Sequence, residues 1–397
     1  MKKKYLRICK DCGQKFFTEG ERDFYKKHNL KYPNRCKKCR EIAKQNTKPN
    51  IIQEELPENL LFEVMTKDEL NTDADTLFII GNGFDLLHGA KSTYYNFKDF
   101  LGKRSELREA LEYYIDKEDI WGDFEDSLAH IDRVKVLESL DLLLEDFNAT
   151  DEDDDDFTYA NFYSSIDQTV CELDMILYDL PIIFKKWVRI LKCKTDKFPL
   201  KNLINIQAKY ITFNYTEFIE TLYSVPRENI LYIHGCRKDK NAQLILGHGH
   251  NPDEMFDKWY EEHKNIKVSS DDIVSLAYFS DDDNDLDLWK YPNRYYAADQ
   301  AITRIEDYYE NSAKKTEDVL KKNKSYFKNI TATKIFVIGH SLSFVDYPYF
   351  KEIINNLENA DSIEWYISFY CNKDIKRIEE FAKNMQIDLK QIKIFKI

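Results

Sequence analysis

Residues Thr76–Gly89 read TLFIIGNGFDLLHG, and this stretch indicates the fold of the larger part of the chain. Thr76–Ile80 is a β-forming run that leads directly into the glycine turn GNG at 81–83, and Asp85 follows where a helix begins, in the manner of an N-cap. A buried strand followed by two glycines is how an α/β protein brings bare backbone, with its N–H groups, up to a ligand. The dinucleotide fingerprint is incomplete, because Leu86 occupies the place of its third glycine. The stretch therefore predicts an α/β domain with a ligand site at this turn.

Length and composition bound the class of protein. A chain of 397 residues suggests two or three domains, and 43% hydrophobic with 14% aromatic residues is typical of a folded protein. No apolar run follows the first lysines, and the most apolar helical stretch, Met175–Leu191, carries four charged residues. We therefore expect no secretory signal, no membrane span and a cytoplasmic location. Thiols stay reduced there, so the eight cysteines are expected to be metal ligands or buried thiols.

The charge is unevenly distributed. The net charge of −13 conceals a basic segment at 1–45 and a strongly acidic remainder. In the basic segment, Cys9 and Cys12 form one C-x-x-C pair, and Cys36 and Cys39 form another. Four thiolates at this spacing close a tetrahedral zinc site, which leaves no open position for catalysis. We predict a structural zinc held by these four cysteines, and the segment also resembles a small zinc-ribbon family.

The partner of this basic module is left open. Its lysines and arginines would neutralise phosphates, and Phe16, Phe17 and Tyr25 would stack on bases, if it binds nucleic acid. The alternative is a solvated basic face around a small core that buries the same aromatic residues. Nucleic acid and protein are therefore both candidate partners.

The pattern along the chain predicts three parts. We expect a zinc ribbon at 1–45, a linker at 46–71 with one short helix over Glu58–Met65, and an α/β domain at 72–397. A helical insertion at about 103–195 covers the site or makes an oligomer contact; the sequence leaves both open. Runs of acidic residues at 151–156 and 281–287 are expected to be surface loops. After the insertion, the predicted strands are Tyr210–Phe213, Ile230–Ile233, Leu244–Leu246, Lys334–Ile338, Glu364–Phe369 and Gln391–Ile397.

Five of these strands, counting the first, end in glycine or in a few polar residues. In an open, mostly parallel α/β sheet, ligands bind in the crevice outside the carboxyl ends of the strands. Residues far apart in the sequence are therefore expected to converge there. The candidates are Asn82, Asp85, Asn214, His234, His248 and Ser341.

Several motifs together resemble a known family. LFIIGNGFDLLHG, WGDFE, ITFNYTEFIETLY, YIHG, LGHG and FVIGHSLSFVDYPYF resemble the AbiH family of phage abortive-infection proteins. The resemblance covers roughly 72–397 and leaves the zinc module outside. It implies a role in phage defence, and it adds a phage protein to the candidate partners of the basic module.

The order of the motifs also resembles the Rossmann-like, sirtuin-like fold of NAD-consuming enzymes. That resemblance implies that Asn214 orients the ribose or the attacking water, and that His234 is the general base. The same resemblance places Asp85 among both the catalytic residues and the NAD-binding residues. The other residues implied to contact NAD are Gly81, Asn82, Gly83, Thr216, Gly339, His340 and Ser341.

The implied chemistry suits these residue types. Cleavage of the N-glycosidic bond of NAD+ expels neutral nicotinamide, so the reaction needs a base for water more than an acid for the leaving group. A histidine near its ordinary pKa accepts that proton, and an amide holds the nucleophile. The alternatives are a structural histidine at a strand end and an Asn-Tyr turn. Asp85 would repel a pyrophosphate at the helix N-terminus, so it points at a ribose hydroxyl or an amide, or the ligand is no dinucleotide.

The sequence thus predicts an NAD+-hydrolysing phage-defence effector with a structural zinc. One alternative is a module that senses nucleotide or nucleic acid without turnover. A lesser alternative is a metal-dependent nuclease at His248 and His250, for which no third ligand can be named. The product, ADP-ribose or its cyclic form, and a possible homo-oligomer are left open.

Overall fold

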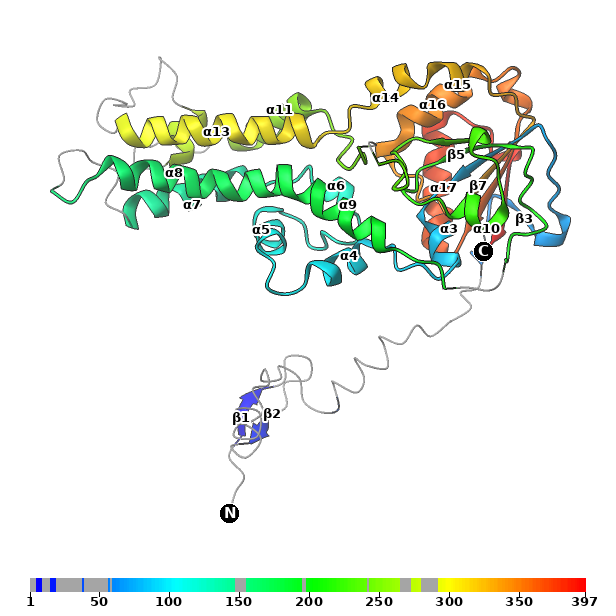
Figure 1. The fold of residues 1–397 in the computed structure, drawn as a ribbon. Coiled ribbons are helices and arrows are strands. Elements are labelled where there is room, and N and C mark those ends of the chain that lie inside the picture. The colour runs from blue at the N-terminus through cyan, green and yellow to red at the C-terminus, as the bar shows by residue number, and fades with distance from the viewer. Residues whose placement is uncertain are drawn as a thin grey trace. The chain divides into compact units, whose positions relative to one another are not determined.

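The computed structural model divides the chain into two compact units, Met1–Glu58 and Asn59–Ile397 (Figure 1). The residues that it describes are 5–8, 15–18, 38, 56–57, 59–146, 155–194, 198–240, 243–264, 273–279 and 292–397. In the first unit, strands β1 (Tyr5–Ile8) and β2 (Lys15–Thr18) form an antiparallel pair. The four cysteines predicted to bind zinc lie outside the described residues.

The second unit is built on a seven-stranded sheet in which every pair of neighbours is parallel. The order of the strands is β3-β9-β8-β7-β4-β5-β6. This confirms the predicted α/β class with its Rossmann-like sheet. The strands are β3 (Glu63–Met65), β4 (Thr76–Ile80), β5 (Lys209–Thr212), β6 (Ile230–Tyr232), β7 (Lys334–Ile338), β8 (Glu364–Phe369) and β9 (Ile392–Lys396).

Both faces of the sheet are covered, as parallel sheets require. Alternate residues of a strand point to opposite faces, so Leu77 and Ile79 of β4 join one core while Phe78 and Ile80 join the other. Helices α14 to α17 supply the first core, and α3, α4, α5, α9 and α10 supply the second. The five residues of β4 are all buried, which explains why this strand could be predicted from a short run of β-forming, mostly apolar residues.

Helices account for most of the remaining described residues. Before β5 they are α3 (Asn82–Leu87), α4 (Tyr94–Leu101), α5 (Glu106–Tyr114), α6 (Phe124–Ser127), α7 (Arg133–Asp146), α8 (Tyr159–Asp174) and α9 (Leu180–Ile190), with a π-helical turn at Met175–Asp179. After β5 they are α10 (Phe218–Tyr223), α11 (Pro252–His263), α12 (Ile273–Tyr278), α13 (Pro292–Ser312), α14 (Thr316–Lys322), α15 (Lys324–Lys328), α16 (Tyr347–Asn356) and α17 (Asn372–Met385). Short 3-10 turns lie at Lys67–Glu69, Arg227–Asn229, Phe344–Asp346, Ala360–Ser362 and Leu389–Gln391.

The inserted helices form a layer with a core of its own. Figure 1 shows the long helices α7, α8 and α13 side by side, away from the sheet. Leucines of α7, Phe162 and Ile166 of α8, and alanines of α13 pack together there. Small residues on α13 allow its backbone to approach its neighbours closely, so this later segment completes the layer that the insertion begins.

Three local predictions are wrong. Asp85, expected at the N-cap of a helix, lies inside α3, whose N-cap is Gly81. The helix expected over Glu58–Met65 is absent from its described part, because residues 63–65 form β3 and pair with β9. A short isolated helix gains too little to compete with hydrogen bonds to an open sheet edge. The strand expected at Leu244–Leu246 is also absent. Leu244 is buried in the core and Ile245 N–H donates to His234 O at 3.0 Å, so the apolar run reflects core packing rather than a strand.

The order of the strands creates a switch point at β4. From β4 the chain proceeds to β5 and β6 on one side, and it later returns to β7, β8 and β9 on the other. In an open parallel sheet, ligands bind outside the carboxyl ends of the strands at such a switch point. The glycine turn at 81–83 is at this position.

Candidate functional site

A cavity of about 640 Å³ lies at this switch point. Its walls come from the loops after β4, β5, β6, β7 and β8, from α4, and from helices α6 and α9 of the insertion. The insertion therefore covers the site, which was one of the two roles expected for it. Every residue predicted from the sequence as catalytic or cofactor-binding lines this one cavity. They are Gly81, Asn82, Gly83, Asp85, Asn214, Thr216, His234, Gly339, His340 and Ser341.

The glycines of the turn pack against a second glycine turn after β7. Gly81 N–H donates to Ile338 O at 2.9 Å, and Gly83 N–H donates to Gly339 O at 2.7 Å. A Cβ on Gly81 would lie 2.4 Å from the Cα of His340, and one on Gly83 would lie 2.6 Å from the Cα of Gly339. These two N–H groups are therefore used by the protein itself. The expectation that they face a ligand is wrong, and the glycines are required by the close approach of two loops.

Asp85 points into the protein. Its Oδ1 accepts a hydrogen bond from Asn214 Nδ2 at 2.7 Å, and its Oδ2 accepts one from Thr216 Oγ1 at 2.6 Å. Asn214 Nδ2 also donates to Gly81 O at 3.0 Å, so both amide protons are used. Of the two orientations expected for Asp85, an amide is the one observed. Its carboxylate does not oppose a ligand at the turn; it fixes the amide of Asn214.

Burial raises the pKa of the Asp85 carboxyl to about 7, although Thr216 and Asn214 donate hydrogen bonds to it. In the unfolded chain an aspartate titrates near 3.9, so between about pH 4 and pH 7 the folded state binds more protons. The free energy of unfolding contributed by this group therefore falls as the pH rises through that window.

Asp85→Asn should remove this pH dependence, because asparagine keeps the shape without the charge. We expect wild type to lose on the order of 4 kcal/mol relative to the variant between pH 4 and pH 7. Urea unfolding at a series of pH values measures it, with Asp299→Asn on the exposed surface of α13 as the control that follows wild type. Parallel curves for wild type and Asp85→Asn would contradict the assignment.

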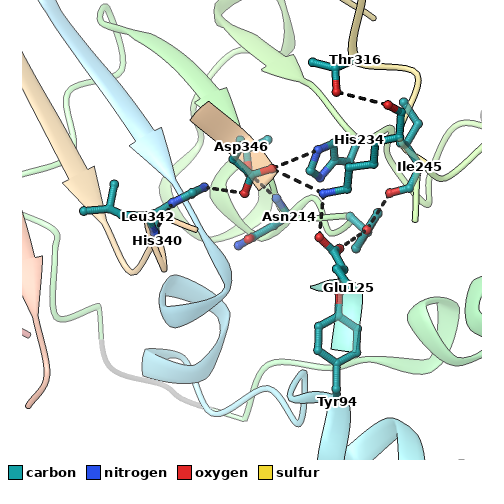
Figure 2. A network of polar contacts seen from close by, with 12 residues as sticks. Tyr94, Glu125, Asn214, His234, Ile245, Thr316, His340, Leu342 and Asp346 are labelled. Carbon is teal, nitrogen blue, oxygen red and sulfur yellow. Dashed lines mark hydrogen bonds and ion pairs between the residues drawn. The ribbon is translucent and has the colours of Figure 1, made fainter. Parts of the chain in front are cut away.

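A buried ionic network lies beside Asn214 (Figure 2). Lys314 Nζ donates to Glu125 Oε2 at 2.6 Å and lies 3.4 Å from Asp346 Oδ1, and its side chain is fully buried. Burial would lower the pKa of Lys314, but the carboxylates of Asp346 and Glu125 raise it above its ordinary value. Tyr94 Oη donates to Glu125 Oε1 at 2.7 Å. The network thus holds a lysinium between two carboxylates at the cavity wall.

Asp346 lies between two histidines. Its Oδ2 is 3.4 Å from His340 Nε2, and its Oδ1 is 3.8 Å from His234 Nε2. His340 Nδ1 accepts from Leu342 N–H at 2.9 Å, which directs its other nitrogen toward Asp346. Burial alone would raise the pKa of Asp346, but Lys314 and the histidines hold it well below its usual range. Asp346 is therefore an anion facing both rings.

His234 is a neutral base. Only 2% of its surface is exposed, and burial, with the nearby Lys314, lowers its pKa to about 3. This departs from the expected ordinary pKa. A hydrogen bond joins the ring to the backbone of Phe213, while within the described part of the chain Nε2 has no hydrogen-bond partner. Nε2 is therefore an acceptor without a donor, and the ring lies beside the Asp346 carboxylate (Figure 2).

Sequence reasoning missed the ionic residues. Glu125 is the last letter of WGDFE and Asp346 stands in SFVDY, so both lie inside quoted motifs whose letters were given no role. Lys314 follows a helix in the plain stretch AKK, where nothing signals burial. Conversely, His248 does not line the cavity. It is fully buried, burial lowers its pKa to about 4, and its Nδ1 accepts from His250 N–H at 3.3 Å.

These features define an α/β protein with a charged cavity at the switch point of a parallel sheet. Residues 77–369, more than half of the chain, match the family model described as Bacteriophage abortive infection AbiH. The chain therefore belongs to the AbiH family, which supports a role in phage abortive infection.

The N-terminal segment matches a different model. Residues 5–48 match one described as a probable treble clef domain, a zinc-binding fold, which agrees with the predicted four-cysteine structural zinc. Comparison with curated proteins and with solved structures gave no match. Within the described residues, none of the helices has the length and apolar character that crossing a membrane requires.

Proposed function

We propose that this protein is an abortive-infection effector that hydrolyses NAD+ at the bond between ribose and nicotinamide. The observation that supports this most is the free Nε2 of a neutral, buried His234, 3.8 Å from the ionised Asp346 in the cavity. A neutral imidazole next to a fixed carboxylate accepts a proton from water and is stabilised once it has become charged.

Each residue at the site is assigned one part of the reaction. The C1′–N1 bond breaks and its electron pair stays on nicotinamide, which leaves uncharged. Glu125 and Asp346 at the wall stabilise the positive charge that develops on the ribose. Water forms the new bond to C1′ and its proton passes to His234 Nε2, so NAD+ and water give nicotinamide, ADP-ribose and a proton. Water attacking a cationic ribose is acidic, so a weak base suffices.

Asn214 is the positioning residue. Its two amide protons are committed to Asp85 and Gly81, Asn214 lines the cavity, and no described residue donates a hydrogen bond to its Oδ1. That oxygen is an acceptor for the attacking water or a ribose hydroxyl. In this assignment Asp85 acts through Asn214 and does not touch the substrate.

Charge at the wall favours a ligand with a cationic end. Among the described residues lining the cavity, six are acidic: Asp85, Asp123, Glu125, Asp346, Asp374 and Glu380. Arg377 of α17 is the single arginine or lysine in that lining, and it is the candidate partner for the diphosphate. The pyridinium of NAD+ would then lie on the acidic side, where its departure as a neutral molecule is assisted.

The test is chromatography of NAD+ incubated with the purified full-length protein, together with NAD+ measured in phage-infected cells that express it. We expect nicotinamide and ADP-ribose to appear in equal amounts as NAD+ is consumed, at least once infection has begun. Cells that are protected from phage while their NAD+ stays constant would overturn the proposal and favour a binding module without turnover.

A further inference from the structure

A second group of titratable side chains lies outside the cavity. Asp126 is on α6, His130 follows four residues later, and His250 lies in the loop before α11. Asp126 Oδ1 is 2.7 Å from His250 Nε2, and Asp126 Oδ2 is 3.8 Å from His130 Nε2. One ligand atom from each residue lies within 4.8 Å of the others. These three residues are called the Asp-His-His cluster below.

The donor set is one that transition metals use. Two imidazole nitrogens and one carboxylate oxygen bind zinc in open sites and iron in facial sites, with the remaining positions left to solvent or a ligand. Ligand atoms bonded to one zinc ion at about 2.1 Å lie about 3.4 Å apart, so small side-chain rotations would bring this cluster to that geometry. The histidine rings are partly exposed, which gives an ion access.

The loop that carries His250 is held in place by its glycines. A Cβ on Gly247 would lie 2.2 Å from Ser312 O, and one on Gly249 would lie 2.8 Å from the Cα of Val345. Each glycine therefore allows a close contact that anchors the loop on one side. The motif GHGH consequently has a structural explanation, and it presents His250 to α6 as a preformed ligand.

A cation already lies beside Asp126. The Lys117 ammonium contacts Asp126 Oδ2, and the lysine side chain is 29% exposed. A metal ion would replace this ammonium as the counter-charge, and the lysine would turn into solvent.

We propose that Asp126, His130 and His250 bind a divalent transition-metal ion of the zinc class, separate from the zinc of the N-terminal module. The structure supplies the ligands that the sequence could not name for His250, and it leaves His248 out of the set. The proposal does not depend on NAD+ hydrolysis. The ion would cross-link the His250 loop to α6, whose Glu125 is the neighbour of Asp126 and lines the cavity.

The experiment measures bound zinc in the full chain by mass spectrometry after equilibration with zinc and removal of excess ion. Cobalt titration is the second readout, since an oxygen and nitrogen site lacks the intense thiolate absorption of the four-cysteine site. We expect His250→Ala to hold one ion fewer than wild type and to bind the cobalt of this site at least about tenfold more weakly. His263→Ala, a partly exposed histidine on α11, should match wild type.

Lys117→Met should have the opposite effect on metal affinity. It removes the ammonium that competes with the metal ion for Asp126, so we expect it to bind cobalt more tightly than wild type. If His250→Ala fails to fold, Asp126→Asn replaces it in the zinc and cobalt measurements. The cobalt affinity of Lys117→Met tests the proposal in either case. Equal metal content in wild type and His250→Ala, or cobalt affinity unchanged in Lys117→Met, would overturn the proposal.

Discussion

His234→Ala is expected to lower the rate of nicotinamide release by about 10²–10⁴-fold, the usual contribution of a general base. The substitution removes the free Nε2 that faces Asp346 across 3.8 Å, and no other described histidine nitrogen at the cavity is similarly free, since His340 Nδ1 is engaged by Leu342 N–H. The loss should be in kcat, because the base acts on water rather than on the bound nucleotide. Steady-state chromatography of nicotinamide measures it.

Two comparisons make that result interpretable. His263→Ala, outside the cavity, should leave the rate unchanged. His234→Gln keeps a polar side chain of similar length without a base, so it should be as slow as alanine while its melting temperature stays closer to that of wild type. If His234→Gln is folded and as active as wild type, His234 is a structural residue and the assigned mechanism is wrong.

Lys314→Met is expected to lower the free energy of unfolding by about 3–5 kcal/mol near neutral pH. The lysine side chain is completely buried, and its ammonium contacts Glu125 Oε2 at 2.6 Å and Asp346 Oδ1 at 3.4 Å. Methionine fills similar space but leaves two carboxylates in the interior without their cation. Removing one member of a buried ionic group costs this much because the charges left behind are neither solvated nor paired.

The free energy of unfolding lost in Lys314→Met should depend on pH. Lys314 holds the folded-state pKa of Asp346 below its unfolded value, so this stabilisation is present above about pH 4 and is lost as the pH falls below it. The difference between wild type and Lys314→Met should therefore shrink in acid. Urea unfolding measures it, and Lys321→Met is the matched control. That lysine is 72% exposed and pairs with an 88% exposed Glu317, so the change should stay within about 0.5 kcal/mol. If both variants lose the same free energy of unfolding, burial of the ionic network does not increase the cost of removing its lysine, and the prediction is wrong.

Most of the sheet was predictable from local patterns. The strands at Thr76–Ile80, Lys334–Ile338 and Glu364–Phe369 have the predicted bounds, because each is a short buried run that ends at a polar or glycine residue. Edge elements were predicted less well. Glu63–Met65 is a three-residue strand in which Glu63 and Val64 are exposed and Met65 is only partly buried. Its sequence therefore carries little burial signal, and pairing with the open edge of β9 makes it a strand.

The candidate site was predictable as a set of positions but not as a set of interactions. Parallel strands bring their carboxyl ends to one edge, which is why Asn214 and His234 could be placed together with the glycine turn. The same rule does not predict which groups form hydrogen bonds with Asn214 and His234. Asp85, expected to conflict with a ligand, instead fixes Asn214 across 129 residues of sequence.

The sequence by itself determined the strand and glycine turn at 76–83, the parallel α/β class, and the motifs by which the chain belongs to the AbiH family. These are properties of contiguous residues, whose periodicity and backbone freedom act locally. Only the tertiary structure decided that the glycines serve loop packing, that His234 is neutral, and that Lys314 joins Glu125 across 189 residues. Partners so distant are selected by the topology of the sheet, and the strength of their charges depends on burial, which exists only after the chain has folded.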